Sequence, residues 1–263
     1  MNGRAPPLLA WLDAAQSVVA LNELAATAQA GLEGASAALT YGETPLAQLS
    51  ALFDVVRQHG GLQAGGGRRD TFVDLGCGGG KLVLGAALNP SFRVLLGIEM
   101  LPSLVREAQS LHTQMLEHLT RGKDADAEVL QTAERAQFIC ADLLDLSALS
   151  AAGAVWWDPE RDASEPAEGG GGGGCHIVFV NSLCFPARLT RAICERIATM
   201  PCNTFIAATT ELPWAQSGMD TMLELLYTNA DDPNMDFIAM AMGDDAAGAN
   251  FWDDFVLYLW RKR

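Results

Sequence analysis

In the middle of the chain, short apolar runs with the length of strands alternate with segments whose apolar positions recur at helical spacing. Short apolar runs at 72–75 and 94–98 have the length of buried strands, and a glycine-rich turn and an apolar helical run at 82–88 follow the first. Residues 102–119 carry apolar side chains three and four positions apart, which is typical of one helix face. Strands alternating with helices predict an α/β protein with a doubly wound, seven-stranded, mostly parallel, Rossmann-like sheet.

The pattern continues towards the carboxyl end. We expect a charged connection at 122–134, strands at 136–140, 177–180 and 203–208, and a helix at 186–200. Beyond residue 208 we expect a loop at 209–214, a short helix at 219–227, and a closing strand pair at 235–242 and 254–260.

Two helical segments precede the first strand. Residues 11–38 are Ala-rich with apolar positions at helical spacing, and the apolar side chains of 46–56 fall on one helix face. We expect 1–40 to form a helical cap, over a cofactor cleft or elsewhere, and 41–263 to form the main domain. Residues 151–175, with six consecutive glycines and the pair Trp156 and Trp157, predict a flexible insertion.

The segment 71–81, TFVDLGCGGGK, carries the clearest chemical signal. Glycines let the backbone turn tightly and let a ligand approach closely. A dinucleotide fingerprint would have a third glycine where Lys81 stands, and a P-loop would have Ser or Thr where Leu82 stands. The acid Asp74 lies two residues before Gly76, and this D-x-G-x-G form suits S-adenosylmethionine, whose ammonium and sulfonium groups a carboxylate can balance. A dehydrogenase and a purely structural turn are weaker alternatives.

Glu99 ends the second apolar run, about twenty residues further on. An acid at this distance binds ribose hydroxyls in nucleotide-cofactor folds. Together, the turn and Glu99 predict a cofactor site.

The net charge of the 263-residue chain is −15, from 17 basic and 32 acidic residues. Strong nucleic-acid binding is not expected, because phosphate contacts need clustered Lys and Arg. The six cysteines are scattered without a C-x-x-C pair, so we expect reduced thiols and no metal site. No apolar run has the length of a membrane span or the form of a signal peptide, and we expect a nuclear or cytoplasmic protein.

Four blocks resemble the catalytic domain of the DOT1 family of histone lysine methyltransferases. They are YGETPLAQLSALFDVV from residue 41, FVDLGCGGGKLVL from residue 72, GIE at 97–99 and IVFVNSLCF at 177–185. The resemblance covers about 41–208 and implies S-adenosylmethionine as cofactor and a protein lysine as target, a histone being one candidate.

The turn and the resemblance together assign the site. The expected cofactor-binding residues are Tyr41, Glu43, Thr44, Asp74, Gly76, Cys77, Gly78, Lys81, Glu99, Asp142, Leu143 and Asn181. The resemblance implies that Asn181, Phe185 and Tyr258 line the methyl-transfer channel, with Trp252 and Tyr258 as the approximate matches to two late aromatic residues of the family.

Several alternatives remain open at these positions. Asp142 could simply cap a turn, Tyr258 is equally compatible with packing on an edge strand, and Thr44 could act only as a helix N-cap. At Asn181 the sequence is NSLC rather than the N/D-P-P-[YF] motif of methyltransferases that act on planar amino groups, which disfavours that target class. For the whole chain, the alternatives are a class I methyltransferase acting on a small molecule or a non-histone protein, and a catalytically inactive binding module with this fold.

Overall fold

The structure is a computed structural model. It describes residues 7–15, 21, 23, 44, 46–62, 70–121, 126–145, 175–182, 185–228 and 257–263.

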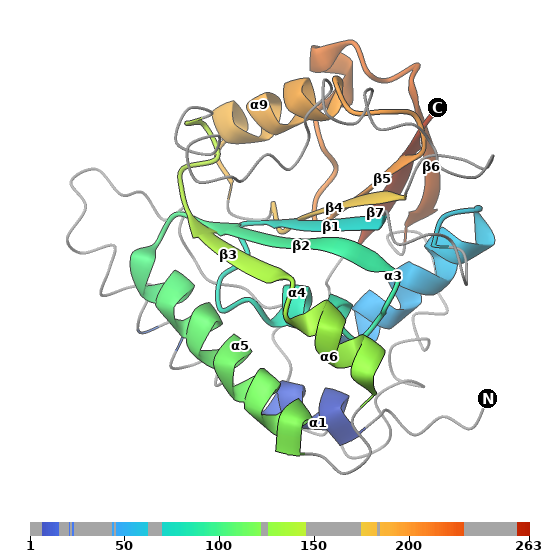
Figure 1. The fold of residues 1–263 in the computed structure, drawn as a ribbon. Helices are drawn as coiled ribbons and strands as arrows, with labels where there is room; N and C mark the ends of the chain where they lie inside the picture. Colours follow the sequence, from blue (N-terminus) through green and yellow to red (C-terminus); the bar gives the residue numbers. More distant parts are fainter. Residues whose placement is uncertain are drawn as a thin grey trace, which may run out of the picture.

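The described chain forms one seven-stranded sheet with helices on both faces (Figure 1). The strands are β1 (Asp70–Leu75), β2 (Phe92–Glu99), β3 (Ala136–Cys140), β4 (His176–Val180), β5 (Thr204–Ala208), β6 (Leu223–Thr228) and β7 (Tyr258–Lys262). Their order is β3-β2-β1-β4-β5-β7-β6; β1 to β5 are parallel, and β7 runs antiparallel to both its neighbours. The sheet is doubly wound, as predicted, and its strand order reverses between β1 and β4.

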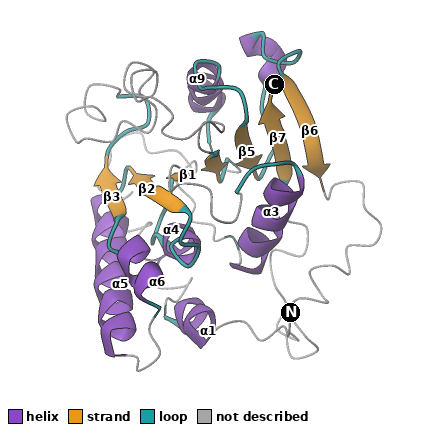
Figure 2. Ribbon diagram, turned by 45° about the vertical axis from the view of Figure 1, so that its right-hand side comes forward, coloured by secondary structure: helices purple, strands orange, loops and turns teal. Residues whose placement is uncertain are grey.

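Among the described residues, the helices cover the two faces of the sheet unequally. They are α1 (Pro7–Ala14), α3 (Leu46–Gln58), α4 (Lys81–Ala86), α5 (Pro102–Arg121), α6 (Ala127–Ala133), α9 (Ala187–Ile197) and the short 3-10 helix η2 (Trp214–Ser217). Figure 1 shows α9 on one side of the sheet and α1, α4, α5 and α6 on the other. In the turned view of Figure 2, α3 lies beneath the end of the sheet formed by β7.

Strand alternation supplies a core to each face. On the α3 side, the rings of Phe53, Phe72 and Phe92 meet at centroid distances between 5.4 and 6.0 Å. On the α9 side, buried Val73 and Val178 belong to one apolar cluster with Ile193 of α9. Side chains at successive strand positions point to opposite faces, so a fully buried strand must be apolar at nearly every position.

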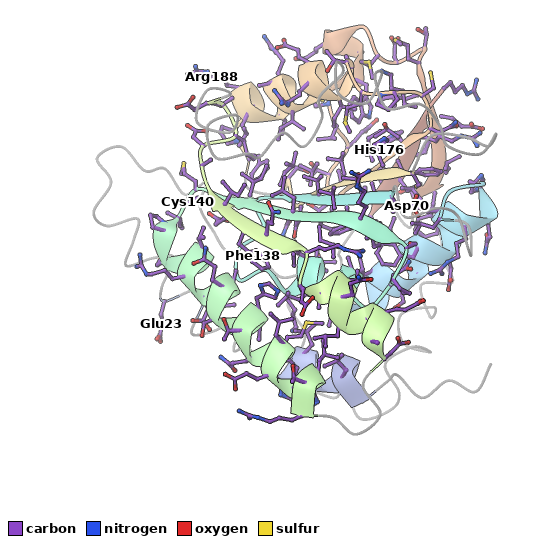
Figure 3. All side chains as sticks on the ribbon, viewed as in Figure 1. Glu23, Asp70, Phe138, Cys140, His176 and Arg188 are labelled. Atoms are coloured by element: carbon purple, nitrogen blue, oxygen red, sulfur yellow. The ribbon has the colours of Figure 1, made fainter. Side chains whose placement is uncertain are left out.

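The sheet has two functionally different edges. Cys140, at the end of β3, and Asp70, at the start of β1, lie at opposite ends of the strands (Figure 3). Ligands in such open sheets bind outside the carboxyl ends of the strands, near the point where the strand order reverses. In this protein that point is the end of β1, where the glycine turn begins.

The amino-terminal helix packs away from the carboxyl edge. The Trp11 ring of α1 stacks on His118, in the last turn of α5, at 5.0 Å, and Leu12 is buried in the core on that face. Since α5 begins beside the end of β2, its last turn is remote from the carboxyl edge. The predicted helix at 11–38 begins earlier than expected, because α1 begins at Pro7, and the chain bends at Ala15. Nearly all of the rest of that segment lies outside the described residues.

Two other expectations are corrected. The segment 219–227, predicted as a helix, is a turn that continues into the edge strand β6 from Leu223, because pairing with β7 decides the conformation of a short apolar run. The charged connection at 122–134 contains α6, whose N-cap Asp126 accepts a hydrogen bond from the Glu128 amide at 2.8 Å. The expected strand at 235–242 lies outside the described residues, as do Trp156, Trp157 and the glycine run.

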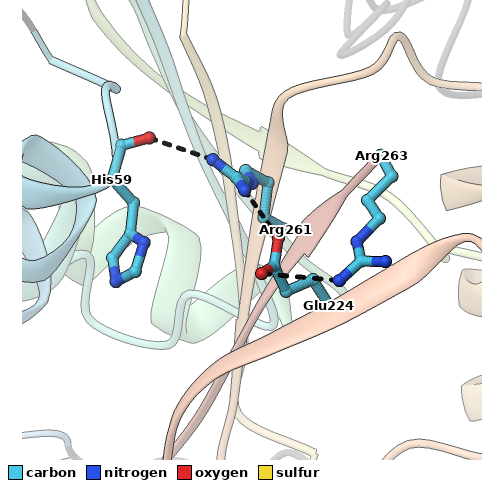
Figure 4. A network of polar contacts seen from close by, with 4 residues as sticks. All are labelled: His59, Glu224, Arg261 and Arg263. Atoms are coloured by element: carbon cyan, nitrogen blue, oxygen red, sulfur yellow. Dashed lines mark hydrogen bonds and ion pairs between the residues drawn. The ribbon is translucent and has the colours of Figure 1, made fainter.

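The carboxyl terminus is fastened by a polar network (Figure 4). Arg261 of β7 donates hydrogen bonds to the His59 carbonyl after α3, at 3.2 Å, and to Glu224 of β6, at 2.5 Å. Arg263 pairs with the same carboxylate at 3.5 Å. The hydrogen bonds that Glu224 accepts from Arg261 and Arg263 lower the pKa of its carboxyl, and the one from Arg261 has the larger effect. The network therefore ties α3 to the antiparallel end of the sheet.

Candidate active site

The glycine turn joins β1 to α4 at the carboxyl edge. Gly76, Gly78 and Gly80 have φ angles of 82°, 52° and 79°, a region that other residues rarely adopt. The amides of Gly76 and Cys77 donate hydrogen bonds to the Ile98 carbonyl at 2.8 and 3.0 Å. The turn is thus attached to β2 as well as to its own strand.

At positions 80 and 97, close packing leaves no room for a Cβ atom. A Cβ at Gly80 would lie 2.4 Å from the ring of Phe138 and 2.8 Å from Ala108. A Cβ at Gly97, in β2, would lie 2.7 Å from the Cys77 sulfur. Figure 3 shows Phe138 on β3, on the α5 side of the sheet. The turn therefore sits against β2, β3 and α5 with no room for added atoms.

Glu99 holds the turn in place. Its Oε2 accepts a hydrogen bond from the Gly78 amide at 3.0 Å, and its Oε1 accepts one from the Leu101 amide at 2.9 Å. Burial raises the pKa of Glu99, and these backbone hydrogen bonds act in the opposite direction. From the sequence, Glu99 was predicted to bind a ribose, but its two hydrogen bonds to the backbone amides of Gly78 and Leu101, here called the clasp, were not predicted. Because each carboxylate oxygen can accept a second hydrogen bond, the clasp leaves acceptor capacity for a ribose.

Asp74 is the least satisfied polar residue of the site. It lies in the central strand between Gly97 of β2 and Phe179 of β4, its side chain is 2% exposed, and its Oδ1 has no hydrogen-bond partner. Burial, with the charge of Glu99 as a second cause, raises its pKa to about 8. Native proteins leave few buried polar atoms unpaired, and such atoms often mark a function or a missing ligand.

Cys77 and Lys81 flank the turn and are both buried. Burial raises the pKa of the Cys77 thiol well above its usual value, and the charges of Asp74 and Glu99 act in the same direction. A thiol kept protonated in this way is a packing group rather than a nucleophile. Lys81 begins α4 at the position where a dinucleotide-binding turn has its third glycine.

The ends of β4 and β5 are joined by two hydroxyl contacts. Thr209 donates a hydrogen bond to Asn181 Oδ1 at 3.1 Å, and the hydroxyls of Ser182 and Thr210 lie 2.6 Å apart. The amide of Asn181 is therefore oriented by the β5 loop. Sequence reasoning singled out Asn181 but not the two threonines, whose position directly after a predicted strand was the available signal.

Phe185 reaches the glycine turn from the loop before α9. Its ring carbon Cζ would lie 2.8 Å from a Cβ placed on Gly76. The structure thus brings Phe185, Gly76 and the end of β4 together at the carboxyl edge. An aromatic ring lies over the start of the turn, near Asn181, which follows the end of β4.

Tyr258 lies at the same edge but is engaged in packing. It pairs with Ala208, the last residue of β5, and its ring stacks on Trp260 at 5.3 Å with an interplanar angle of 7°. Trp260 in turn meets Trp214 edge-on at 5.3 Å. This geometry agrees with the alternative in which Tyr258 packs on the sheet. Trp252 lies outside the described residues.

The remaining predicted residues are divided between described and undescribed parts of the chain. Asp142 follows β3 and is exposed, and Leu143 is half-buried. The Oδ1 atom of Asp142 accepts a hydrogen bond from the Leu144 amide at 2.9 Å, as expected if Asp142 caps a turn. Thr44, just before α3, is 2% exposed and its hydroxyl has no hydrogen-bond partner, so it makes no N-cap bond. Tyr41 and Glu43 lie outside the described residues.

A hollow of about 400 Å³ lies elsewhere, between α1 and the last turns of α5. It is lined by Trp11, Gln114, Glu117, His118 and Arg121 and contains no predicted site residue. Within the described ranges, no group of three or more His, Cys, Asp or Glu side chains could hold a metal ion. The described helices also include none that is long and apolar enough to cross a membrane.

The family model of the histone methylation protein DOT1 matches residues 33–138. The match includes the glycine turn, Glu99 and the first three residues of β3. Over this part of its length, the chain is similar to that family. The DOT1-like match stops before β4, so Asn181, Phe185 and Tyr258 lie beyond it. No curated relative matches the sequence.

Solved structures similar to this chain are remote in sequence. An rRNA methyltransferase from Streptomyces viridochromogenes is 16% identical, with 84% of this chain and 86% of that chain covered and a TM-score of 0.42. A geranyl diphosphate C-methyltransferase from Streptomyces coelicolor A3(2) is 11% identical, with 82% and 79% covered and a TM-score of 0.46. A magnesium protoporphyrin IX methyltransferase from Synechocystis PCC 6803 is 13% identical, with 94% and 99% covered and a TM-score of 0.43.

The strand order of the sheet, rather than these similarities, defines the fold. A doubly wound sheet that ends with an antiparallel strand inserted between β5 and β6 is the class I methyltransferase arrangement. The predicted fold class is confirmed.

Proposed function

We propose that this protein is a DOT1-like methyltransferase, which binds S-adenosylmethionine at the glycine turn and transfers its methyl group to the amine of a lysine in a basic protein. The observation that carries the proposal is the unpartnered Oδ1 of Asp74, buried at the carboxyl end of the central strand. A ligand with a positively charged end would satisfy this oxygen. S-adenosylmethionine has such an end and no phosphate for a P-loop or dinucleotide turn to bind.

Other groups around the turn fit the same ligand. Glu99 ends β2 beside the turn and keeps acceptor capacity for ribose hydroxyls. Thr44 contributes a second buried and unpartnered oxygen, just before a helix whose first residue, Leu46, contacts α4 at Gly85. Asp142 and Leu143 follow the end of the neighbouring strand β3, where they would contact the adenine amino group. These residues would bind and orient the cofactor.

Alignment is the main contribution of the protein to the reaction. When bound, the cofactor supplies a methyl group activated by its sulfonium, open to in-line attack by a neutral amine. Holding the reactants in line can lower the barrier by about 7 to 11 kcal/mol. Asn181 would orient the cofactor or the amine through its amide, and Phe185 would provide an apolar wall. Apolar surroundings favour the neutral amine because they lower the pKa of a lysine.

Charge argues for a basic protein and against a nucleosome as substrate. A net charge of −15 attracts Lys-rich polypeptides and repels DNA phosphates. Free histones or another Lys-rich protein are therefore the favoured targets. The second candidate is a methyltransferase of this fold that acts on a small molecule, because the family match stops at residue 138, before Asn181 and Phe185.

The experiment combines binding with methyl transfer. S-adenosylmethionine is titrated calorimetrically into the wild type and Asp74→Ala, and labelled cofactor is then supplied with free core histones, nucleosomes, a lysate and a small-molecule extract. The proposal expects binding by the wild type, at least tenfold weaker binding by Asp74→Ala, and label on a protein lysine. Label only on small molecules would replace lysine transfer by the second candidate. Absence of binding by the folded wild type would overturn the cofactor assignment.

A further inference from the structure

Asp74 and Glu99 are two buried carboxyls whose hydrogen bonding differs. Glu99 accepts backbone hydrogen bonds from Gly78 and Leu101 on its two oxygens. Hydrogen bonds of this kind favour the ionised form of a carboxyl. Asp74 is equally enclosed, yet its Oδ1 has no partner and no hydrogen bond acts to lower its pKa. When two interacting carboxyls share a buried site, the less supported one keeps the proton.

We propose that Asp74 carries a proton in the cofactor-free protein and releases it to solvent when the positively charged amino-acid end of S-adenosylmethionine binds beside it. The inference rests on the proposed function, because it takes S-adenosylmethionine as the ligand. The O–H bond of the carboxyl breaks, the proton passes to the buffer, and the ligand ammonium replaces it as the counter-charge. Cofactor binding is then an exchange of one positive charge for another.

The surroundings of Asp74 favour this exchange. Glu99 from β2 and the Cys77 thiol from the turn are the titratable neighbours that interact with it, and both are neutral or negative. Phe179, its partner on β4, is apolar. Two of the described basic residues lie on neighbouring elements. Lys81 begins α4, and the charge of Arg106, on α5, acts to lower the pKa of Cys140. A lone anion at Asp74 would be poorly stabilised, whereas an anion paired with a bound ammonium would not be.

Calorimetry in buffers of different ionisation enthalpy counts the released protons. The wild type is titrated with S-adenosylmethionine in phosphate and in Tris at about pH 7, and the difference in heat should correspond to release of close to one proton per ligand. Affinity should rise by up to about tenfold per pH unit as the pH approaches 8 and should fall above it, where the ligand ammonium loses its own proton. Asp74→Asn should bind more weakly and release almost none, whereas Asp54→Asn, an exposed carboxyl on α3, should behave as the wild type.

Two ligands locate the charge that displaces the proton. S-adenosylhomocysteine keeps the amino-acid end and should release the same proton, whereas 5′-methylthioadenosine lacks that end and should release none. Infrared difference spectra of the wild type should lose a protonated-carboxyl band when S-adenosylmethionine binds, which tests the inference even if Asp74→Asn does not fold. Tight binding without proton release would overturn the inference and leave the proposed function standing. No binding of S-adenosylmethionine would overturn both.

Discussion

Glu99 and Gly78 are joined by a hydrogen bond of 3.0 Å, from the backbone amide of the turn to the Oε2 atom of the carboxylate. The other oxygen of Glu99 accepts from the Leu101 amide at 2.9 Å. One acidic side chain thus fixes the glycine turn to the end of β2 and the start of α5. Glu99 therefore positions the turn even when no ligand is bound.

Replacing Glu99 by glutamine should loosen this clasp. A glutamine amide has one acceptor oxygen, so one buried backbone amide loses its partner at a cost of about 1 to 3 kcal/mol. We expect a lower midpoint in urea denaturation and at least about tenfold weaker S-adenosylmethionine binding. Glu134→Gln, an exposed carboxyl next to α6, is the matched control. Equal behaviour of the two variants would show that the clasp does not hold the turn.

Asp74 should make stability decrease with rising pH. Its pKa is about 8 in the folded protein, against 3.8 for an unperturbed aspartate. The folded state therefore binds more protons than the unfolded state between these values, and the contribution present below about pH 4 is lost as the pH rises through about 8. The slope is at most about 1.4 kcal/mol per pH unit.

Asp74→Asn should remove this part of the pH dependence. Urea denaturation of both proteins between about pH 5 and pH 8 isolates the contribution, because all other groups are shared. The variant should gain stability relative to the wild type as the pH rises, even though it binds the cofactor more weakly. A constant difference between the two proteins would contradict the raised pKa.

Gly80→Ala and Gly218→Ala separate packing from backbone strain. Both glycines have positive φ angles, 79° and 67°, so both variants carry a strain of about 1 to 2 kcal/mol. A Cβ at Gly218 meets nothing within 4 Å, whereas one at Gly80 would lie 2.4 Å from Phe138. Gly80→Ala should lose about 1 to 3 kcal/mol more than Gly218→Ala, measured by denaturant unfolding. Equal losses would mean that Phe138 moves aside freely.

Lys262 should contribute to stability without affecting the cofactor. Its buried Nζ donates to the carbonyls of Ala198 and Met200, which follow the end of α9, the bond to Ala198 measuring 2.6 Å. Lys262→Met leaves these acceptors unpaired and should destabilise the fold by about 1 to 3 kcal/mol. Arg263→Met, at the exposed neighbouring residue, should have a smaller effect. S-adenosylmethionine affinity should be unchanged in both variants, and a specific loss in Lys262→Met would contradict a purely structural role.

Thr209 should act on methyl transfer through Asn181. Thr209→Val keeps the shape of the side chain but removes the hydroxyl that donates to Asn181 Oδ1. We expect a reduction of about tenfold in kcat for label transfer, with stability lowered by no more than about 1.5 kcal/mol. Thr209→Ser restores the donor and should restore the rate. Failure of serine to rescue, with valine impaired, would point to packing rather than to orientation of the amide.

Periodicity was a reliable guide wherever the elements are long or buried on both faces. The predicted helix from Pro102 and the strand from Ala136 agree with α5 and β3. It failed at 219–227, where a short apolar run has no conformation of its own until β7 pairs with it. The helix α6 was missed because its seven residues are too few to show a helical apolar stripe that would distinguish it from a connection.

Local chemistry therefore determined the class of this protein, and tertiary structure determined how its site is built. Glycines with an acid two residues earlier and a second acid after the next strand are readable in one dimension, because turn geometry and strand length place them together in every sheet of this type. The partners of those acids are not readable, since the amides that bind Glu99, the hydroxyl that orients Asn181 and the burial that leaves Asp74 unpaired come from segments brought together only by folding. Hydrogen bonding and desolvation depend on distance in space, and the order of residues alone does not specify it.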